Sequence, residues 1–398
     1  MDRPRSHPKQ TSRAQAEPEP FKRPPSLKPL ERVETVLKGE AADRPPFCLY
    51  PAYDLELLGG DVLAQAIQVF VERTETDVVA VPACFGYTLD ANVSLDRPED
   101  LAKIAVVHGR HGAWSQQQDA IRSTCRTFFG KRPVVAVVPS PFLQLQKLAG
   151  QRLTAEALSD KPGFFGQAVE NLSKSLVAFV KAAVEAGVQG IIIEETGASH
   201  ELMELAVYKE RLLPSLLSLI EACKPAWSVV QFLGRRIFWE ELKLPSQGLG
   251  WPVAAGPNLA RGAMRWPGFV WGGLDPEGWS DASTAWLRGS LRQQMGEITS
   301  RPLILTTPGG LRGLSLDRIE ALAFGLRRLP SVERLRETPA ELEARRAAAP
   351  PRPRKHKEER ERPAPPLREA PAPLPGARTR LHAKPSPEEP LSPPVPDL

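Results

Sequence analysis

The sequence predicts an α/β fold, a single (β/α)8 TIM barrel between two proline-rich tails. Between residues 26 and about 335, short apolar runs alternate with helical patterns, which is typical of βα units around a parallel sheet. Eight such runs can be counted, and this barrel has eight strands. Most of the runs are continuously apolar, as expected for strands that are covered on both faces.

The predicted strands follow one another without a break that would divide the region into two domains. A sandwich would show strict alternation of apolar and polar residues instead. The sixth run has the weakest apolar pattern of the eight. In chain order the predicted strands are Phe47–Tyr50, Asp77–Val81, Val134–Val138, Gly190–Ile193, Trp227–Phe232, Trp251–Ala255, Phe269–Gly272 and Leu303–Leu305.

Helical periodicity is clearest from Gly166 to Ala186, where apolar residues recur at three- and four-residue spacing. Gly187 then ends this helix. A shorter helix is predicted from Pro29 to Lys38, ahead of the first strand, with its apolar residues on one face. We expect this short helix to plug the lower mouth of the barrel.

Both ends of the chain have a composition that does not support a packed core. Fifteen of the 42 prolines fall in residues 350–398, where aromatic and β-branched residues almost vanish, so little apolar surface is available to offset ordering entropy. We therefore divide the chain into a disordered tail (1–25), a barrel (26–340) and a second disordered tail (341–398). The proline-rich segment from Pro363 to Pro375 is a spacer or a docking segment for a protein partner.

Composition and charge exclude several classes of protein. The four cysteines form no C-x-x-C pair, which disfavours a disulfide framework or a zinc knuckle. The net charge of +5 is small for this length, and no apolar run approaches the roughly 20 residues of a membrane span. We expect a cytoplasmic protein that binds neither nucleic acid nor membrane.

Five segments resemble a known family in order and spacing. Residues 30–50 read LERVETVLKGEAADRPPFCLY, residues 133–150 read PVVAVVPSPFLQLQKLAG, residues 180–194 read VKAAVEAGVQGIIIE and residues 269–276 read FVWGGLDP, followed by the glycine turn within 303–319. These segments resemble the uroporphyrinogen decarboxylase superfamily, which includes methylcobalamin:coenzyme M methyltransferase-like proteins. The resemblance covers about 300 residues, implies a TIM barrel and allows a homodimer.

The decarboxylases hold the carboxylates of a tetrapyrrole with cationic groups, and this sequence departs from their pattern. The resemblance places the family's two arginines within residues 51–55, where none is found, and its tyrosine at Lys147. The family's final-loop histidine falls at Gly309 or Gly310. The decarboxylase chemistry is therefore not carried over.

The methyltransferase branch uses zinc to hold a thiolate, with ligands from an H-x-C-G segment and a final-loop cysteine. In this sequence the resemblance places those ligands at Gln231, Leu233 and Gly309. None of the three can hold zinc. We therefore expect no metal and no other cofactor.

Active sites of such barrels lie at the carboxyl ends of the strands, so the polar residues there are the candidates. Glu194 and Asp275 are the candidate catalytic acids. The alternative for Glu194 is a strand-end carboxylate bonded to a neighbouring loop, and for Asp275 a loop-stabilising side chain. Arg235 and Arg236 are placed to grip a carboxylate or phosphate, or else to start a solvated helix.

Other residues at the strand ends complete the predicted substrate site. Lys147 is a possible cationic anchor, although a lysine early in a helix usually faces solvent. Backbone N–H groups at Gly309 and Gly310 are candidates to receive an anion, while a tight turn also demands glycine. The predicted substrate-binding residues are Tyr50, Tyr53, Asp54, Lys147, Gln231, Arg235, Arg236, Gly309 and Gly310.

Three functions are compatible with these observations, and they leave open whether the protein is an enzyme. The resemblance implies a lyase of porphyrin metabolism that lacks the family's catalytic groups and binds an anionic small molecule, a tetrapyrrole or a corrinoid. The first alternative is a barrel that binds a ligand or partner without catalysis. The second is a corrinoid-linked, methyltransferase-like protein without the zinc site.

Overall fold

A computed structural model describes the barrel region of the chain. The described residues are 26–50, 59–83, 93–107, 112–238, 241–252, 266–274, 286, 289–290, 302–311, 314–331, 340–341 and 343–344. The chain separates into two compact units between Ala344 and Arg345, and every described residue belongs to the first. The disordered tails predicted at 1–25 and 341–398 lie almost wholly outside these ranges and stay predictions.

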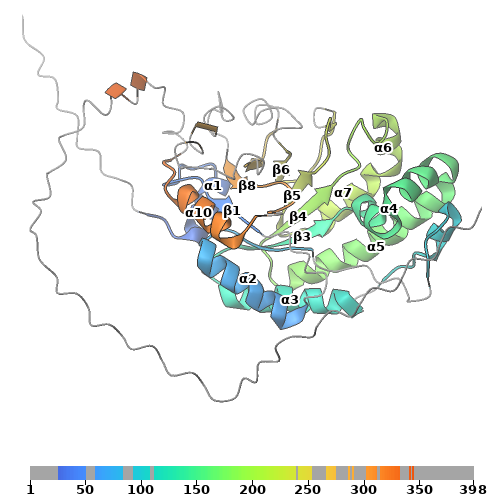
Figure 1. Ribbon diagram of the computed structural model, residues 1–398, viewed down its shortest axis with the longest axis horizontal. Coiled ribbons are helices and arrows are strands. Elements are labelled where there is room, and N and C mark those ends of the chain that lie inside the picture. The colour runs from blue at the N-terminus through green and yellow to red at the C-terminus, as the bar shows by residue number, and fades with distance from the viewer. Residues whose placement is uncertain are drawn as a thin grey trace, which may run out of the picture. The chain divides into compact units, whose positions relative to one another are not determined.

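Eight parallel strands form one sheet in the order β1-β8-β7-β6-β5-β4-β3-β2, which confirms the predicted TIM barrel (Figure 1). Every neighbouring pair in this order is parallel. The strands are β1 (Phe47–Cys48), β2 (Val79–Val81), β3 (Val134–Pro139), β4 (Gly190–Glu195), β5 (Trp227–Phe232), β6 (Gly248–Gly250), β7 (Phe269–Gly273) and β8 (Leu303–Thr306).

The sixth predicted strand was wrong in position. We expected Trp251–Ala255, whereas β6 is Gly248–Gly250, and Trp251 follows it without regular structure. Glycine weakens strand propensity and therefore hides this strand in the sequence. Glycine is nevertheless required here, because a Cβ on Gly248 would lie 2.5 Å from the Phe269 ring inside the barrel.

Helices connect and cover the strands (Figure 1). The predicted Gly166–Ala186 helix begins earlier, at Pro162, because proline is favoured in a first helical turn. Ser140 caps α4 by accepting a hydrogen bond from the Leu143 amide at 3.1 Å. The helical elements are α1 (Pro29–Leu37), α2 (Gly60–Thr74), η1 (Pro98–Lys103), α3 (Gly112–Phe128), α4 (Pro141–Asp160), α5 (Pro162–Glu185), α6 (Leu205–Arg211), α7 (Leu213–Ala222) and α10 (Leu316–Arg327).

Two buried clusters divide the core. One lies between the strands and the surrounding helices. The other fills the inside of the barrel and includes the aromatic residues Phe269 and Trp271. Val33 and Val36 of α1 belong to this inner cluster, so the expectation that the first helix plugs the barrel is confirmed. None of the described helices is long and apolar enough to cross a membrane.

The barrel closes between β1 and β2 without a regular strand ladder. The amides of Asp77 and Val78 both donate to the Phe47 carbonyl, at 2.9 and 3.3 Å. The Thr76 hydroxyl accepts from the Leu49 amide at 3.0 Å and lies 3.0 Å from the Phe47 carbonyl oxygen. Side chains of the segment before β2 therefore replace part of the missing ladder.

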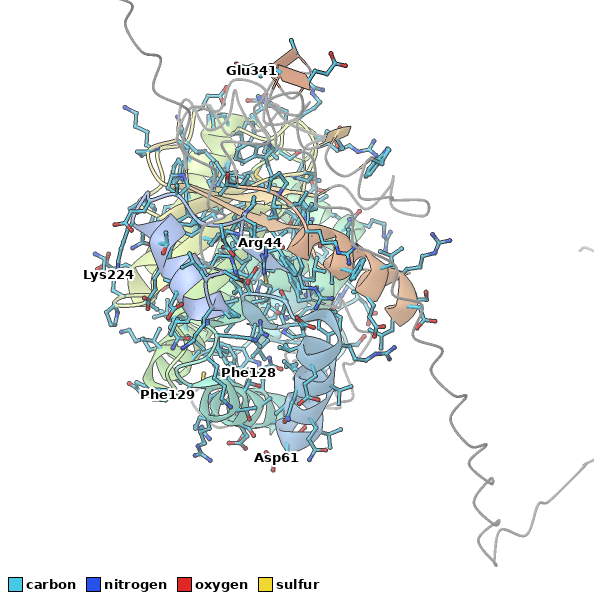
Figure 2. The ribbon with its side chains drawn as sticks, turned by 90° about the vertical axis from the view of Figure 1, so that its left-hand side faces the viewer. Arg44, Asp61, Phe128, Phe129, Lys224 and Glu341 are labelled. Carbon is cyan, nitrogen blue, oxygen red and sulfur yellow. The ribbon has the colours of Figure 1, made fainter. Side chains whose placement is uncertain are left out.

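The Asp77 carboxylate joins this seam to α1. It accepts from Arg32 at 2.6 Å, from Arg44 at 2.5 Å and from the Phe47 amide at 3.0 Å. The Asp77 side chain is fully buried, and the two arginines are 4% and 10% exposed. Arg32 also binds Asp43 at 2.7 Å. Figure 2 labels Arg44 within this packed region.

Asp77→Ala is expected to lower the free energy of unfolding by about 3–5 kcal/mol, because two buried guanidinium groups would lose their shared partner. Denaturant unfolding measures the effect. The matched control is Asp119→Ala. The Asp119 carboxylate is 52% exposed and pairs with Arg122, so its loss should leave the free energy of unfolding close to that of the wild type. Equal effects of the two substitutions would contradict the central role of Asp77.

Candidate functional site

Inward-facing residues at the carboxyl ends of the strands form one ring, which we call the mouth ring. The alternation of side chains defines it, because every second residue of a strand faces inward and each member is the last inward-facing residue at its strand's carboxyl end. Glu194 pairs with Pro139 and Gln231, Gln231 pairs with Gly250, and Gly273 pairs with Thr306. Tyr50 follows β1 two residues after inward-facing Cys48. The mouth ring comprises Tyr50, Pro139, Glu194, Gln231, Gly250, Gly273 and Thr306.

Tyr50 and Glu194 meet inside the barrel. The Tyr50 hydroxyl donates to Glu194 Oε1 at 3.2 Å, across a separation of 144 residues. Tyr50 is 2% exposed and Glu194 9%. Both were predicted site residues, and the structure brings them together.

Gln231 is fully buried, and its amide lies against β6. Its Nε2 donates to the Phe232 carbonyl at 3.1 Å, whereas its Oε1 has no hydrogen-bond partner. A Cβ on Gly250 would lie 2.5 Å from that Oε1 and closer still to the Trp271 carbonyl oxygen. Glycine at 250 therefore lets the Gln231 amide occupy this position.

The end of β8 brings two further buried hydroxyl groups. Thr306 and Thr307 are both fully buried, and neither hydroxyl has a hydrogen-bond partner. Gly309 and Gly310 follow with φ angles of 69° and 76°, values that favour glycine. A Cβ on Gly310 would lie 2.8 Å from the Tyr50 ring, so glycine there also allows close packing against β1.

The cationic residues predicted to bind substrate are exposed, and their predicted role stays a prediction. Lys147 is exposed on α4, and Arg235 and Arg236 are exposed after β5. The Arg236 carbonyl accepts a hydrogen bond from the His200 amide at 3.1 Å, so its backbone holds the loop after β4. Tyr53, Asp54 and Asp275 lie outside the described residues, and their predicted roles stay predictions.

The three positions that resemble zinc-ligand positions converge in space. Gln231 and Leu233 are two residues apart at the end of β5, and a Cβ on Gly309 would lie 3.5 Å from Leu233 Cδ2. An amide, an aliphatic chain and a glycine do not fit zinc. In the part of the chain that the structure describes, no group of three or more His, Cys, Asp or Glu side chains is placed to hold a metal.

The cysteine thiols of the described residues, Cys48, Cys125 and Cys223, are free and buried. Burial raises the pKa of each thiol, to about 11 for Cys125 and to about 12 for Cys223. A thiol with a raised pKa is a poor nucleophile. These cysteines are core residues.

Glu195 is a buried carboxyl group on the opposite side of β4 from Glu194. It lies in the layer between strands and helices, and its carboxylate accepts a hydrogen bond from the Gly197 amide. Burial raises the pKa of Glu195 to about 7, although bonds from Gly197 and Ser140 favour the charged form. Glu195 also raises the pKa of Tyr208, after the larger effect of burial, and the Tyr208 hydroxyl has no hydrogen-bond partner.

The raised pKa of Glu195 makes stability depend on pH in a defined direction. An unfolded glutamate titrates near pH 4.3, so between about pH 4.3 and 7 the folded chain keeps a proton that the unfolded chain has lost. The free energy of unfolding should therefore fall by about 3–4 kcal/mol as pH rises through this window. Glu195→Gln should remove this loss and be more stable than the wild type at pH 8.

Denaturant unfolding of both proteins from pH 4.5 to 8.5 measures this difference. Glu170→Gln is the control. Glu170 is exposed and pairs with Lys174, and the hydrogen bond from Lys174 lowers the pKa of Glu170 instead of raising it. If the free energy of unfolding of Glu195→Gln changed with pH in parallel with that of the wild type, Glu195 would not be the group with the raised pKa.

The wild-type protein is expected to bind no stoichiometric zinc after purification in zinc-containing medium, because its three converging positions offer no ligand set. Elemental analysis per chain measures this. The variant carrying Gln231→His, Leu233→Cys and Gly309→Cys is the positive control for the spatial assignment. One tightly bound zinc in the wild type would overturn the assignment of these positions.

Comparison with known proteins supports the resemblance. Residues 88–268 match the model of the uroporphyrinogen decarboxylase (URO-D) family. A search of curated protein sequences gives no significant match.

Two solved structures share the fold. A methyltransferase from Methanosarcina mazei is 16% identical with a TM-score of 0.60, over 76% of this chain and 98% of that one. A B12-independent methionine synthase from Shewanella sp. W3-18-1, in complex with selenomethionine, is 13% identical with a TM-score of 0.50, over 71% of this chain and 95% of that one. At these identities the likeness shows the fold alone. The resemblance read from the sequence is thus confirmed for residues 88–268, which match the uroporphyrinogen decarboxylase family model and lie within a (β/α)8 barrel.

Proposed function

We propose that this protein is a small-molecule-binding barrel of the uroporphyrinogen decarboxylase superfamily, and that it does not decarboxylate uroporphyrinogen. The observation that carries the proposal is the polar content of the mouth ring. Tyr50, Glu194, Gln231 and Thr306 supply all of its polar side chains. None of these four carries a positive charge.

Decarboxylation of a tetrapyrrole with several acetate groups needs cations to hold the carboxylates and to stabilise developing negative charge. The candidate cations Lys147, Arg235 and Arg236 are exposed, whereas Tyr50, Glu194, Gln231 and Thr306 of the mouth ring are buried. Among the side chains of the mouth ring, Glu194 is the one carboxyl group, and the Tyr50 hydroxyl donates to it at 3.2 Å.

Buried polar atoms favour ligand binding over a barrel that is simply filled. Gln231 Oε1, Thr306 Oγ1 and Thr307 Oγ1 are buried without partners. Each unsatisfied buried group costs about 1–3 kcal/mol, and an apolar residue of similar shape would avoid this cost. The presence of several such groups at the end of a TIM barrel where active sites lie supports a binding role. We do not propose zinc-dependent thiol transfer, because Gln231, Leu233 and Gly309 cannot hold the metal.

The experiment measures binding by isothermal titration calorimetry. It compares uroporphyrin and cobalamin with a broad panel of uncharged and cationic metabolites. We expect a panel member to bind one per chain and to lose at least tenfold in affinity in Glu194→Gln. Incubation with uroporphyrinogen under anaerobic conditions should give no coproporphyrinogen.

Lys147→Ala is the matched control, because it changes an exposed charge on the same end of the barrel and should leave binding unchanged. Formation of coproporphyrinogen with release of carbon dioxide would overturn the proposal. So would a complete lack of binding across the panel.

A further inference from the structure

Two loops that follow the carboxyl ends of β4 and β5 are bonded to each other. We call them the rim loops, and they comprise residues 196–204 and 233–238. Ser199 pairs with Ile237 in an antiparallel bridge, and the Ser199 hydroxyl donates to the Arg235 carbonyl at 2.5 Å. The Phe238 amide donates to the Ala198 carbonyl at 3.1 Å. A movement of one rim loop is therefore passed to the other.

Glu195, the last residue of β4, holds the start of the first rim loop. Its carboxylate accepts a hydrogen bond from the Gly197 amide. The amides of Thr196 and Ala198 and the Ser140 hydroxyl also bond to this carboxyl group. Ser140 is the residue that caps α4. One carboxyl group thus joins β4, the first rim loop and the beginning of α4.

Apolar side chains pack around the same carboxyl group, and Glu195 is 2% exposed. A Cβ on Gly197 would lie 2.8 Å from both Leu212 Cδ1 and Phe142 Cδ1, and 2.9 Å from Glu195 Oε1. Phe142 belongs to α4, and Leu212 precedes α7. The rim loop at Gly197 is therefore packed tightly between these side chains and the carboxyl group.

The titratable groups around Glu195 include no positive partner. Tyr208 of α6 lies near Glu195, and its hydroxyl has no hydrogen-bond partner. His200 of the first rim loop is exposed, and its ring packs against Phe238. Glu194 faces the inside of the barrel, on the other side of β4. Within the part of the chain that the structure describes, Glu195 forms no ion pair.

Burial without a cation makes the ionised form of Glu195 costly, because the carboxylate loses its hydration. Burial raises the pKa of Glu195 to about 7, although four hydrogen-bond donors favour the charged form. Hydration of the carboxylate requires the Gly197 amide, and with it the first rim loop, to move away. A hydrated glutamate titrates near pH 4.3. The closed rim is therefore most stable below about pH 4.3 and loses this stability as pH rises to about 7.

We propose that Glu195 is a positioning residue for the rim of the barrel, and that ionisation of its carboxyl group opens the rim loops. These loops follow the strands that carry Glu194 and Gln231 of the mouth ring, at the end of the barrel where active sites lie. Their opening then controls access to that end of the barrel. This inference goes beyond the proposed function and does not depend on the identity of a ligand.

Hydrogen exchange of the full chain between pH 5 and pH 8, followed by mass spectrometry and corrected for the intrinsic rate at each pH, tests the inference. In the wild type, the opening equilibrium of the rim loops should rise about tenfold or more over this range. In Glu195→Gln it should not change with pH. The matched control is Glu201→Gln, which removes an exposed carboxyl group from the same loop and should keep the pH dependence of the wild type.

Ser140→Ala tests the same carboxyl group without removing it. The substitution removes a hydrogen bond that favours the charged form of Glu195. The pH at which rim opening reaches its plateau should therefore be higher than in the wild type. Because Ser140 also caps α4, the result is judged by the position of this plateau on the pH scale. An unchanged position would overturn the role of Glu195.

Three results of the exchange experiment would overturn the inference. The first is an equal rise of opening in the rim loops and in α2, because pH would then act on the whole fold. The second is protection of the rim loops that grows with pH, because the charged carboxylate would then hold them closed. The third is a pH dependence that persists in Glu195→Gln. None of these measurements uses a ligand, so failure here is distinct from a lack of binding across the panel.

Discussion

The arrangement of the barrel depends on how the two strands at the ends of the sheet order, β1 and β2, are joined. All other neighbouring strands share a parallel ladder, whereas this seam relies on the Thr76 hydroxyl and on backbone bonds to Phe47. The Asp77 carboxylate then fixes α1 and the segment before β1 through Arg32 and Arg44. The desolvation of these charges is offset only because every partner is present. The position of Tyr50, which follows β1, is set by the same network.

With β1 held in this way, the inside of the barrel has two parts of different chemistry. Next to α1 it is filled by aliphatic and aromatic residues, including Trp227 and Phe269 with ring centroids 5.6 Å apart. At the carboxyl ends it becomes polar, with Glu194 and Gln231 on adjacent strands. Glu194 and Glu195 occupy consecutive positions yet face different environments, because successive side chains of a strand point to opposite faces. One carboxyl group belongs to the mouth ring and the other to the helix layer.

Much of the fold was predictable because strands covered on both faces are continuously apolar, and β3 and the first four residues of β4 are runs of this kind. Strand β6 was not, since its glycines serve packing inside the barrel rather than strand propensity. The rule that sites lie at strand ends identified Tyr50, Glu194 and Gln231. It could not show that Tyr50 and Glu194 touch, because their contact spans 144 residues. Lys147, Arg235 and Arg236 were chosen by chemical type, and only packing decides which way such side chains point.

The glycine at 250 limits which substitutions this protein can accept. A side chain there would collide with the Gln231 amide, but also with the Trp271 carbonyl oxygen. Replacing Gln231 by a smaller residue relieves the first collision and leaves the second, because a backbone atom cannot be substituted away. Position 250 on β6 therefore cannot gain a side chain through a compensating substitution at Gln231 alone, and a new ligand preference has to come from the side chains of other strands.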